Sequence, residues 1–358
     1  MNTSIHITKV QQSRVGEIDF DNIPFGRVFS DHMFLADYRD GKWQDLRIVP
    51  FGPFTMHPAS MALHYGQAIF EGMKASKTLD GKAMLFRPDM HAKRLNRSAA
   101  RLMMPAVPED LFLEALHTLV ELDAAWIPPR EGSALYIRPY MFATDEFIGV
   151  RPSETYRFAI FTGPVGPYYP KPVRLKIEQE YVRAVPGGTG EAKAAGNYAG
   201  SLLPAHLAQQ QGFDQVVWMG GPDKKQIQEV GTMNIFFVID GTVVTPATDG
   251  AILHGITRDS FLKILREKGI PAEERVITID EVVEAHQAGT LTEMFGAGTA
   301  AVVSHVAEVV YGEVAITFPP VDQRPIGNML KDYIDGLRSG RIADTHNWMI
   351  PVSSAVLA

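Results

Sequence analysis

A Pro- and Gly-rich stretch near the middle of the chain is the feature that most constrains its fold. Residues 163–172 read Gly-Pro-Val-Gly-Pro-Tyr-Tyr-Pro-Lys-Pro, and the halves on either side each mix strand and helix patterns. Proline removes a backbone donor and glycine adds conformational freedom, so such a stretch interrupts regular structure. We interpret it as an interdomain linker or as a loop across a domain junction. A chain of 358 residues is long enough for two domains of ordinary size.

The first half predicts strands and two amphipathic helices. Residues 37–43 read as a strand, an Asp-Gly turn and a second strand. Apolar residues recur at helical spacing over 88–104, where Pro88 suits a first turn, and again over 108–125. A short apolar strand is expected at 156–162.

The second half predicts a similar mixture. A helix over 198–211 contains Pro204, which should kink it or mark a late start. Residues 235–245 form a hairpin pattern around Asp240-Gly241. Thr257 is the expected N-cap of a helix over 258–268, and Asp280 the expected cap of the next helix. We therefore expect an α/β (α+β) chain with an N-terminal domain at 1–165, a linker at 166–182 and a C-terminal domain at 183–358.

Composition narrows the possible functions. The net charge of -7 and the absence of any Lys/Arg run longer than a pair argue against nucleic-acid binding. No stretch approaches 18 consecutive apolar residues, so we expect no membrane partner. The first 20 residues contain no apolar signal-peptide core, and the chain has no cysteine for disulfides, thiolate catalysis or metal binding. These features predict a cytoplasmic protein without a metal site.

One lysine lies in an unusual setting. Residues 187–198 read Gly-Gly-Thr-Gly-Glu-Ala-Lys-Ala-Ala-Gly-Asn-Tyr, so Lys193 is flanked by small residues that let a flat ligand approach the backbone closely. Most lysines lie on solvated faces, but a desolvated lysine is a usable amine nucleophile. Schiff-base chemistry with a carbonyl cofactor is therefore the first reaction class to consider. A phosphate-binding P-loop is a poor alternative, because alanine follows Lys193 where that motif requires Ser or Thr.

Five further sequence blocks, distributed along the chain, place polar residues among small or apolar ones. They are Phe70-Glu71-Gly72-Met73-Lys74-Ala75, Phe86-Arg87-Pro88 through Arg94-Leu95, Glu229-Val230-Gly231-Thr232-Met233-Asn234, Leu253-His254-Gly255-Ile256-Thr257-Arg258 and Phe295-Gly296-Ala297-Gly298-Thr299-Ala300-Ala301. Together with the lysine segment they resemble the branched-chain aminotransferases, pyridoxal-phosphate enzymes of fold type IV. The resemblance extends from about Phe25 to the C-terminal helix. It implies two domains, a smaller N-terminal α/β domain and a larger C-terminal mixed domain, with the site between them.

The resemblance implies a role for each of several residues toward pyridoxal 5′-phosphate (PLP). Lys193 would bond to the cofactor and act as the catalytic base, Glu229 would pair with the pyridine nitrogen, and Tyr198 would contact the phenolic oxygen. The phosphate would be bound by Arg94, Ile256, Thr257 and Thr299. Read without the resemblance, Arg94 is a solvated helix residue and Thr257 only an N-cap.

The resemblance also implies a substrate pocket and a homodimer. Thr232 and the amide of Ala300 would hold the substrate carboxylate, and Arg138 the distal carboxylate of glutamate. The side-chain pocket maps onto Phe25, Tyr65, Phe70, Tyr136, Val150 and Tyr168, with Val150 contributed by the partner subunit. The expected reaction transfers the amino group of L-leucine, L-isoleucine or L-valine to 2-oxoglutarate. Enzymes of the same fold that act on D-amino acids or aminodeoxychorismate are the nearest alternatives.

One motif of some members is missing. A Cys-x-x-Cys pair follows the Gly-Thr-Ala turn in those proteins, whereas this chain has Ala301 and Ser304 there. A thiol switch built on that pair is therefore absent.

Overall fold

The computed structural model describes residues 4–130, 132–166 and 171–352. The chain divides into two compact units, which are described separately. The first contains Met1–Tyr168, Ala192–Ala195 and Asp335–Ala358, and the second contains Tyr169–Glu191 and Gly196–Ile334. Within the described residues, no helix is long and apolar enough to cross a membrane.

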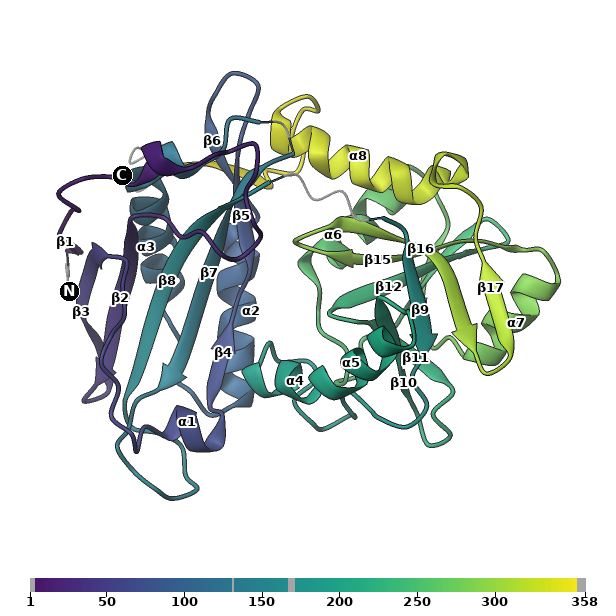
Figure 1. Cartoon of the computed structure of the whole chain (residues 1–358), viewed down its shortest axis with the longest axis horizontal. Coiled ribbons are helices and arrows are strands. Elements are labelled where there is room, and N and C mark those ends of the chain that lie inside the picture. Colours follow the sequence, from purple (N-terminus) through teal and green to yellow (C-terminus); the bar gives the residue numbers. More distant parts are fainter. Residues whose placement is uncertain (1–3, 131, 167–170, 353–358) are drawn as a thin grey trace. The chain divides into compact units, whose positions relative to one another are not determined.

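The first unit is built on one sheet of mainly antiparallel strands, with the order β1-β3-β2-β8-β7-β5-β6-β18 and β4 paired with β7. Its strands are β1 (His6–Ile7), β2 (His32–Arg39), β3 (Lys42–Pro50), β4 (Ala68–Phe70), β5 (Met73–Lys77), β6 (Ala83–Phe86), β7 (Ala134–Ala143), β8 (Tyr156–Val165) and β18 (Met349–Pro351). Its helices are α1 (Met61–Tyr65), α2 (Pro88–Arg101) and α3 (Glu109–Leu122), with short 3-10 turns at Val15–Glu17 and Ala124–Trp126. Figure 1 shows α2 and α3 along one face of this sheet.

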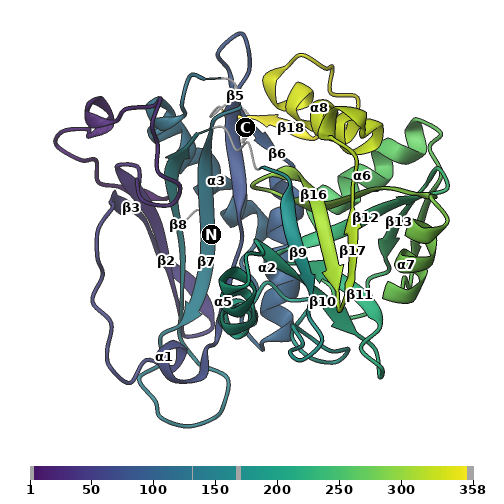
Figure 2. The ribbon, with the colours of Figure 1, turned by 45° about the vertical axis from the view of Figure 1, so that its right-hand side comes forward.

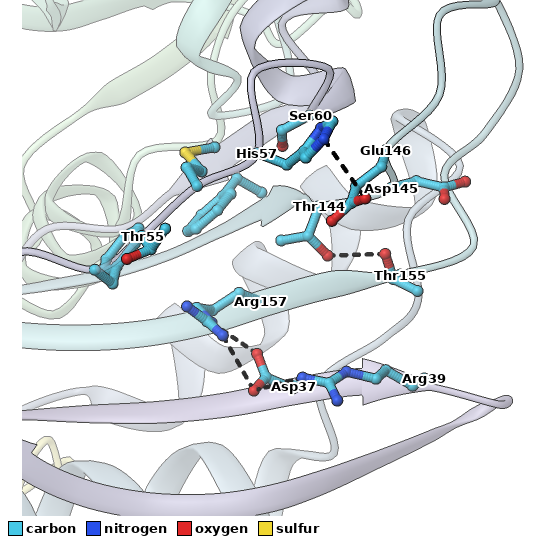
Figure 3. A pocket seen from close by; sticks show the side chains of 13 residues that line it. Asp37, Arg39, Thr55, His57, Ser60, Thr144, Asp145, Glu146, Thr155 and Arg157 are labelled. Atoms are coloured by element: carbon cyan, nitrogen blue, oxygen red, sulfur yellow. Dashed lines mark hydrogen bonds and ion pairs between the residues drawn. The ribbon is translucent and has the colours of Figure 1, made fainter.

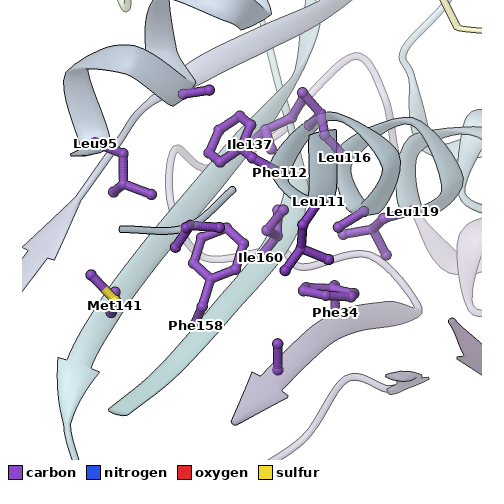
Figure 4. Packing of buried hydrophobic residues seen from close by; sticks show 14 of the residues in the cluster. Phe34, Leu95, Leu111, Phe112, Leu116, Leu119, Ile137, Met141, Phe158 and Ile160 are labelled. Atoms are coloured by element: carbon purple, nitrogen blue, oxygen red, sulfur yellow. The ribbon is translucent and has the colours of Figure 1, made fainter. Parts of the chain in front are cut away.

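The core of the first unit lies between that sheet face and the two helices. Phe112 of α3 is fully buried and stacks on Phe158 of β8, with ring centroids 5.8 Å apart. Leu116 and Leu119, one and two turns further along α3, are also fully buried (Figure 4). The helical spacing read from the sequence therefore predicts this packing correctly.

The second unit contains a sheet that closes on itself. Strands β11, β10, β9, β16, β15 and β12 pair in that order, and β12 pairs again with β11, so the six form a barrel (Figure 2). The strands are β9 (Val173–Ile177), β10 (Gln215–Gly220), β11 (Gln226–Val230), β12 (Met233–Ile239), β13 (Thr242–Pro246), β14 (Ala272–Arg275), β15 (Leu291–Gly298), β16 (Val302–Tyr311) and β17 (Val314–Thr317). The helices are α4 (Ala195–Gly200), α5 (Leu202–Gln210), α6 (Ile256–Glu267), α7 (Ile279–Gln287) and α8 (Pro325–Ser339), with a 3-10 turn at Val321–Gln323. The end of α8, from Asp335 on, belongs to the first unit.

Strand β12 separates two packing regions of this unit. Phe236 stacks on Phe295 of β15, with ring centroids 5.4 Å apart, and both contact Phe261 of α6. Phe237 points the other way, into a cluster that includes Val282 of α7. Successive side chains of β12 thus point to opposite faces of the sheet, one toward α6 and the next toward the cluster that contains α7.

Several sequence expectations differ from the structure. The resemblance implied that the N-terminal domain is the smaller one, but the first unit contains more residues than the second. The reason is that β18 and the end of α8 belong to the first unit. The expected linker at 166–182 includes β9, which pairs with β10 and β16. The helix expected at 198–211 is divided at Ser201, and Pro204 falls in the first turn of α5, where its missing N–H costs little.

Both expected N-caps are wrong by two residues. Helix α6 begins at Ile256 with Gly255 as its N-cap, so Thr257 lies inside the first turn. The cap of α7 is Thr278, whose hydroxyl accepts a hydrogen bond from the Glu281 amide at 3.2 Å, and Asp280 lies within the helix. Thr278 and Glu281 have the spacing of a capping box, which is why Thr278 outcompetes Asp280.

Candidate active site

Lys193 belongs to the first unit, where its backbone is fixed on both sides. Its amide donates to Ser98 Oγ on α2 at 2.9 Å, and its carbonyl accepts from the Phe70 amide at 3.0 Å. The Nζ atom lies 4.8 Å from the centroid of the Phe70 ring. A cation over an aromatic face is held there electrostatically, so the position of this amine is defined by its contacts.

Arg94 lies one helical turn before Ser98 on the same helix. Its side chain is buried, and its guanidinium contacts the carboxylate of Glu71, which follows β4 directly. Helix α2 therefore presents both a buried cation and the hydroxyl that positions Lys193.

Four expected pocket residues come together in the first unit. Arg138 Nη2 donates to the hydroxyl of Tyr136 at 3.1 Å, and the guanidinium lies 4.7 Å from the centroid of Phe70. Phe25 contacts Tyr136 edge to face, with centroids 6.0 Å apart. Phe25, Tyr136 and Arg138 line one cavity of about 240 Å³, which is smaller than the pockets that take drug-sized ligands. The cavity thus combines aromatic walls with one cation.

The remaining pocket residues do not join this group in the first unit. Tyr65 ends α1 and is 40% exposed, and Val150 is 91% exposed. Tyr168 lies outside the described residues. Their expected roles remain predictions.

Glu229 is the centre of a polar group in the second unit. It lies on β11, is 3% exposed, and its Oε1 accepts from the Leu253 amide at 2.8 Å. Asn234, paired with Glu229 across β11 and β12, donates to the Leu253 carbonyl at 2.9 Å. Arg183 Nε lies 3.1 Å from Glu229 Oε2, an ion pair whose N–H is not directed at the oxygen. A backbone amide and an arginine thus fix this buried carboxylate in position.

The N-terminus of α6 adjoins this group. A Cβ atom at Gly255, the N-cap, would overlap Asn234 Oδ1, so only glycine allows this approach. Ile256 and Thr257 follow and are both buried. The first amides of a helix with a nearby hydroxyl form a site for an anion such as a phosphate.

Thr299 and Ala300 lie in the turn between β15 and β16 of the same unit. Val302, which ends this turn, has φ +62°. A β-branched residue rarely adopts that conformation, and such strain concentrates at functional sites. Thr232, in the turn between β11 and β12, is exposed.

Tyr198 lies on α4, which follows the lysine segment. The segment is tied to α4 by Asn197, whose amide donates to the Thr189 carbonyl at 2.8 Å. Gly190 is closely packed, because a Cβ there would overlap the carbonyl oxygen of Ala251. The small residues around Lys193 thus serve close packing as well as ligand approach.

A larger cavity of about 430 Å³ in the first unit has a different character. Figure 3 shows Arg157 and Asp37 facing each other among its lining residues, with Arg157 Nε donating to Asp37 Oδ1 at 2.7 Å. Arg39 Nη2 also contacts Asp37, at 3.3 Å, and Thr144 donates to Thr155 at 2.9 Å. Its charges largely neutralise one another, so we do not place the reaction there.

Sequence reasoning missed four residues that support the site. Glu71 forms an ion pair with Arg94, and His91 contacts Glu71. Ser98 accepts a hydrogen bond from the Lys193 amide, and Arg183 forms an ion pair with Glu229. Glu71 lies inside one of the motif blocks that carry the resemblance, so the sequence could have pointed to it. Its contact with α2 depends on tertiary structure, which the sequence pattern does not predict.

Comparison with known proteins identifies the family. Residues 68–309 match the family model described as amino-transferase class IV. Branched-chain-amino-acid aminotransferase 2 of Bacillus subtilis is 48% identical over 340 residues, which cover 94% of each chain. The branched-chain-amino-acid aminotransferase of Mycolicibacterium smegmatis is 43% identical over 337 residues, covering 92% of each.

Solved structures agree. The branched-chain amino acid aminotransferase from Escherichia coli superposes with a TM-score of 0.72 at 27% identity, covering 90% of this chain and 99% of that one. A T.th. branched-chain amino acid aminotransferase solved with pyridoxamine 5′-phosphate gives a TM-score of 0.70 at 25% identity, covering 89% and 98%. The chain therefore belongs to the class IV aminotransferases and, within them, to the branched-chain amino-acid aminotransferases, which have the fold of type IV.

Members of this class depend on PLP, and the residues of this chain fit that cofactor. Lys193 offers a positioned amine and Arg94 a buried guanidinium. The buried carboxylate of Glu229 would suit a protonated ring nitrogen, and the N-terminus of α6 would suit a phosphate.

Proposed function

We propose that this protein transfers the amino group of L-leucine, L-isoleucine or L-valine to 2-oxoglutarate, giving the branched 2-oxo acid and L-glutamate. The 48% identity to a branched-chain-amino-acid aminotransferase over nearly the whole chain supports this choice of substrates. The observation that carries the proposal is the amine of Lys193, held over Phe70 while its backbone is bonded to Ser98 and Phe70.

Bound PLP supplies a carbonyl carbon and an electron-withdrawing ring for amino transfer. Lys193 would hold that carbon through its amine, and the same amine, once free, would act as the base that moves the proton of the substrate Cα. The carboxylate of Glu229, which is buried and fixed by the Leu253 amide, would favour a proton on the ring nitrogen. Tyr198 would contact the phenolic oxygen.

The phosphate contacts are proposed for residues of two kinds. Arg94 supplies a buried positive charge with a geometry suited to phosphate oxygens. The amides of Ile256 and Thr257, with the hydroxyls of Thr257 and Thr299, supply neutral donors.

Substrate recognition follows from the aromatic cavity and its cation. Phe25, Phe70 and Tyr136 would surround an apolar side chain, with Tyr65 expected to join them, and Arg138 would bind the distal carboxylate of glutamate. Thr232 and the Ala300 amide hold the carboxylate on Cα. One pocket thus takes both an aliphatic and an acidic substrate.

We also propose a homodimer in which Val150 and Tyr168 complete the pocket, Val150 being contributed by the partner subunit. Ile148 is 73% exposed and Val150 91% exposed on the isolated chain, which is a high exposure for apolar side chains close in sequence. The cytoplasmic location expected from the sequence stays a prediction.

The proposal is tested by the visible spectrum of the purified protein with and without L-leucine. We expect a yellow band that shifts when L-leucine is added, with formation of glutamate in the presence of 2-oxoglutarate. D-Alanine and aminodeoxychorismate, offered separately, should leave the band in place. A shift with either of these and none with L-leucine would assign the site to another activity.

A further inference from the structure

Glu71 makes the strongest set of charged contacts around Arg94. Its side chain is 0% exposed, and its carboxylate accepts from Arg94 Nε at 2.7 Å and from Arg94 Nη2 at 2.8 Å. Two parallel hydrogen bonds fix the plane of a guanidinium as well as its position.

His91 supports the same carboxylate from one turn earlier on α2. Its Nδ1 lies 2.7 Å from Glu71 Oε2, and the ring is 2% exposed. Burial lowers the pKa of His91, so the ring is neutral near pH 7, and its Nδ1–H donates because an ionised carboxylate only accepts. Burial alone would raise the pKa of Glu71, but the charge and hydrogen bonds of Arg94, together with the hydrogen bond from His91, outweigh it and hold the pKa well below its ordinary value. Glu71 is therefore an anion that binds one cation and one neutral donor.

Stability alone does not account for this group. Removing two charges from water costs about as much free energy as their attraction returns, and an apolar pair of similar size would serve the core as well. What the ion pair adds is orientation. A long arginine side chain that is already immobilised loses less conformational entropy when it binds an anion.

The fixed orientation of the Arg94 guanidinium matters because this group of residues lies next to Lys193. Glu71 follows Phe70, whose ring lies under Lys193 Nζ, and Arg94 lies one turn before Ser98, which holds the Lys193 amide. We propose that Glu71 and His91 are positioning residues that hold the Arg94 guanidinium ready for the cofactor phosphate, so that they set the affinity for the phosphorylated cofactor more than the rate of the chemical step. This inference rests on the proposed role of Arg94 in phosphate binding.

The experiment compares two probes, PLP and pyridoxal, which lacks the phosphate, by titrating each into the cofactor-free protein and following tryptophan fluorescence. Glu71→Gln keeps the shape and removes the charge. We expect its Kd for PLP to rise about 10- to 100-fold, with a change for pyridoxal of less than about threefold. At saturating PLP, kcat for L-leucine should fall far less than the affinity. Equal weakening of both probes, or an unchanged Kd for PLP, would overturn the proposal.

A second pair of variants covers the case in which Glu71→Gln does not fold. His91→Leu keeps apolar bulk without a donor, and His91→Asn keeps a donor near the position of Nδ1. The leucine variant should lose PLP affinity selectively and the asparagine variant should recover most of it. If the two variants bind PLP alike, His91 does not position Arg94.

Asp37→Asn is the matched control. Asp37 is another buried carboxylate of the first unit that holds an arginine, with Arg157 Nε at 2.7 Å, but it lies on β2. It should change the affinities for PLP and pyridoxal by the same small factor. Wild-type turnover of L-leucine is measured first, because its absence contradicts the proposed function, whereas unselective Glu71 and His91 variants of an active enzyme contradict only the positioning role.

Discussion

Glu229 is the residue whose charge matters most to the proposed chemistry. Glu229→Gln keeps the volume and the acceptor for the Leu253 amide, but a neutral amide does not hold a proton on the ring nitrogen. We expect kcat for L-leucine to fall about 10²- to 10³-fold, the usual cost of losing one electrostatic contact to the reacting group. Steady-state kinetics at saturating PLP measure this. A kcat within about threefold of wild type would contradict the role of Glu229.

Arg138 separates the two substrates of the reaction. Arg138→Gln removes a charge that the acidic substrate needs and the aliphatic one does not. We expect the ratio of kcat/KM for glutamate to that for leucine to fall about 10- to 100-fold, as for loss of a charged hydrogen bond. Both values are measured on the same preparation. Equal losses for the two substrates would show that Arg138 does not distinguish them.

At the scale of elements, the N-terminus of α7 tests the corrected cap. Thr278→Ala removes the hydroxyl that accepts a hydrogen bond from the Glu281 amide. This change should lower the free energy of unfolding by about 1 kcal/mol. Asp280→Ala is the control, because Asp280 only pairs with half-exposed Lys225 and should cost less than about 0.5 kcal/mol. Urea unfolding of both variants measures these two changes in the free energy of unfolding. A larger loss for Asp280→Ala would restore Asp280 as the cap.

Periodicity and turn chemistry predicted most elements but not their ends. The hairpin around Asp240-Gly241 and the helices α2 and α3 follow from spacing alone, because each buries one regular face. The cap of α7 depended on which of two neighbouring polar residues met a free amide, whereas α6 begins after Gly255, which makes no side-chain capping hydrogen bond. That choice is made by local geometry, which composition does not encode.

The candidate site shows the same division between pattern and contact. The blocks around Lys193, Glu229 and Thr257 were visible as motifs. The contact of Glu71 with Arg94 joins residues 23 positions apart and requires the sheet to pack on α2. The pairing of β18 with β6 is also long-range, and it explains why the first unit takes in the end of the chain.

At the scale of the whole molecule, stability should depend on Asp37 in acid. Burial alone would raise the pKa of Asp37, but hydrogen bonds and charge from Arg157, with Arg47, hold it below the ordinary value of 3.8. A carboxyl with a lowered pKa stabilises the fold above its unfolded pKa, and this contribution is lost as pH falls through the folded pKa. The stability difference between wild type and Asp37→Asn should therefore be constant near neutral pH and shrink below about pH 4.

Chemical unfolding of both proteins between pH 7 and pH 3 measures that difference. Hydrogen bonds from Ser13 and Trp126 outweigh burial and also favour the ionised form of Asp31 by lowering its pKa, so wild type itself should lose stability in acid. A difference that stays constant down to pH 3 would show that the charge of Asp37 contributes nothing.

Lys193 is the residue on which the proposed chemistry depends most, and Lys193→Ala tests that chemistry most directly. The measurement is the visible spectrum of PLP-loaded protein together with transamination of L-leucine and 2-oxoglutarate. We predict that the variant binds PLP without the lysine-linked band and that turnover falls at least about 10³-fold, because both the covalent link and the base are lost. A variant that keeps the band and transaminates at the wild-type rate would contradict the assignment of this active site.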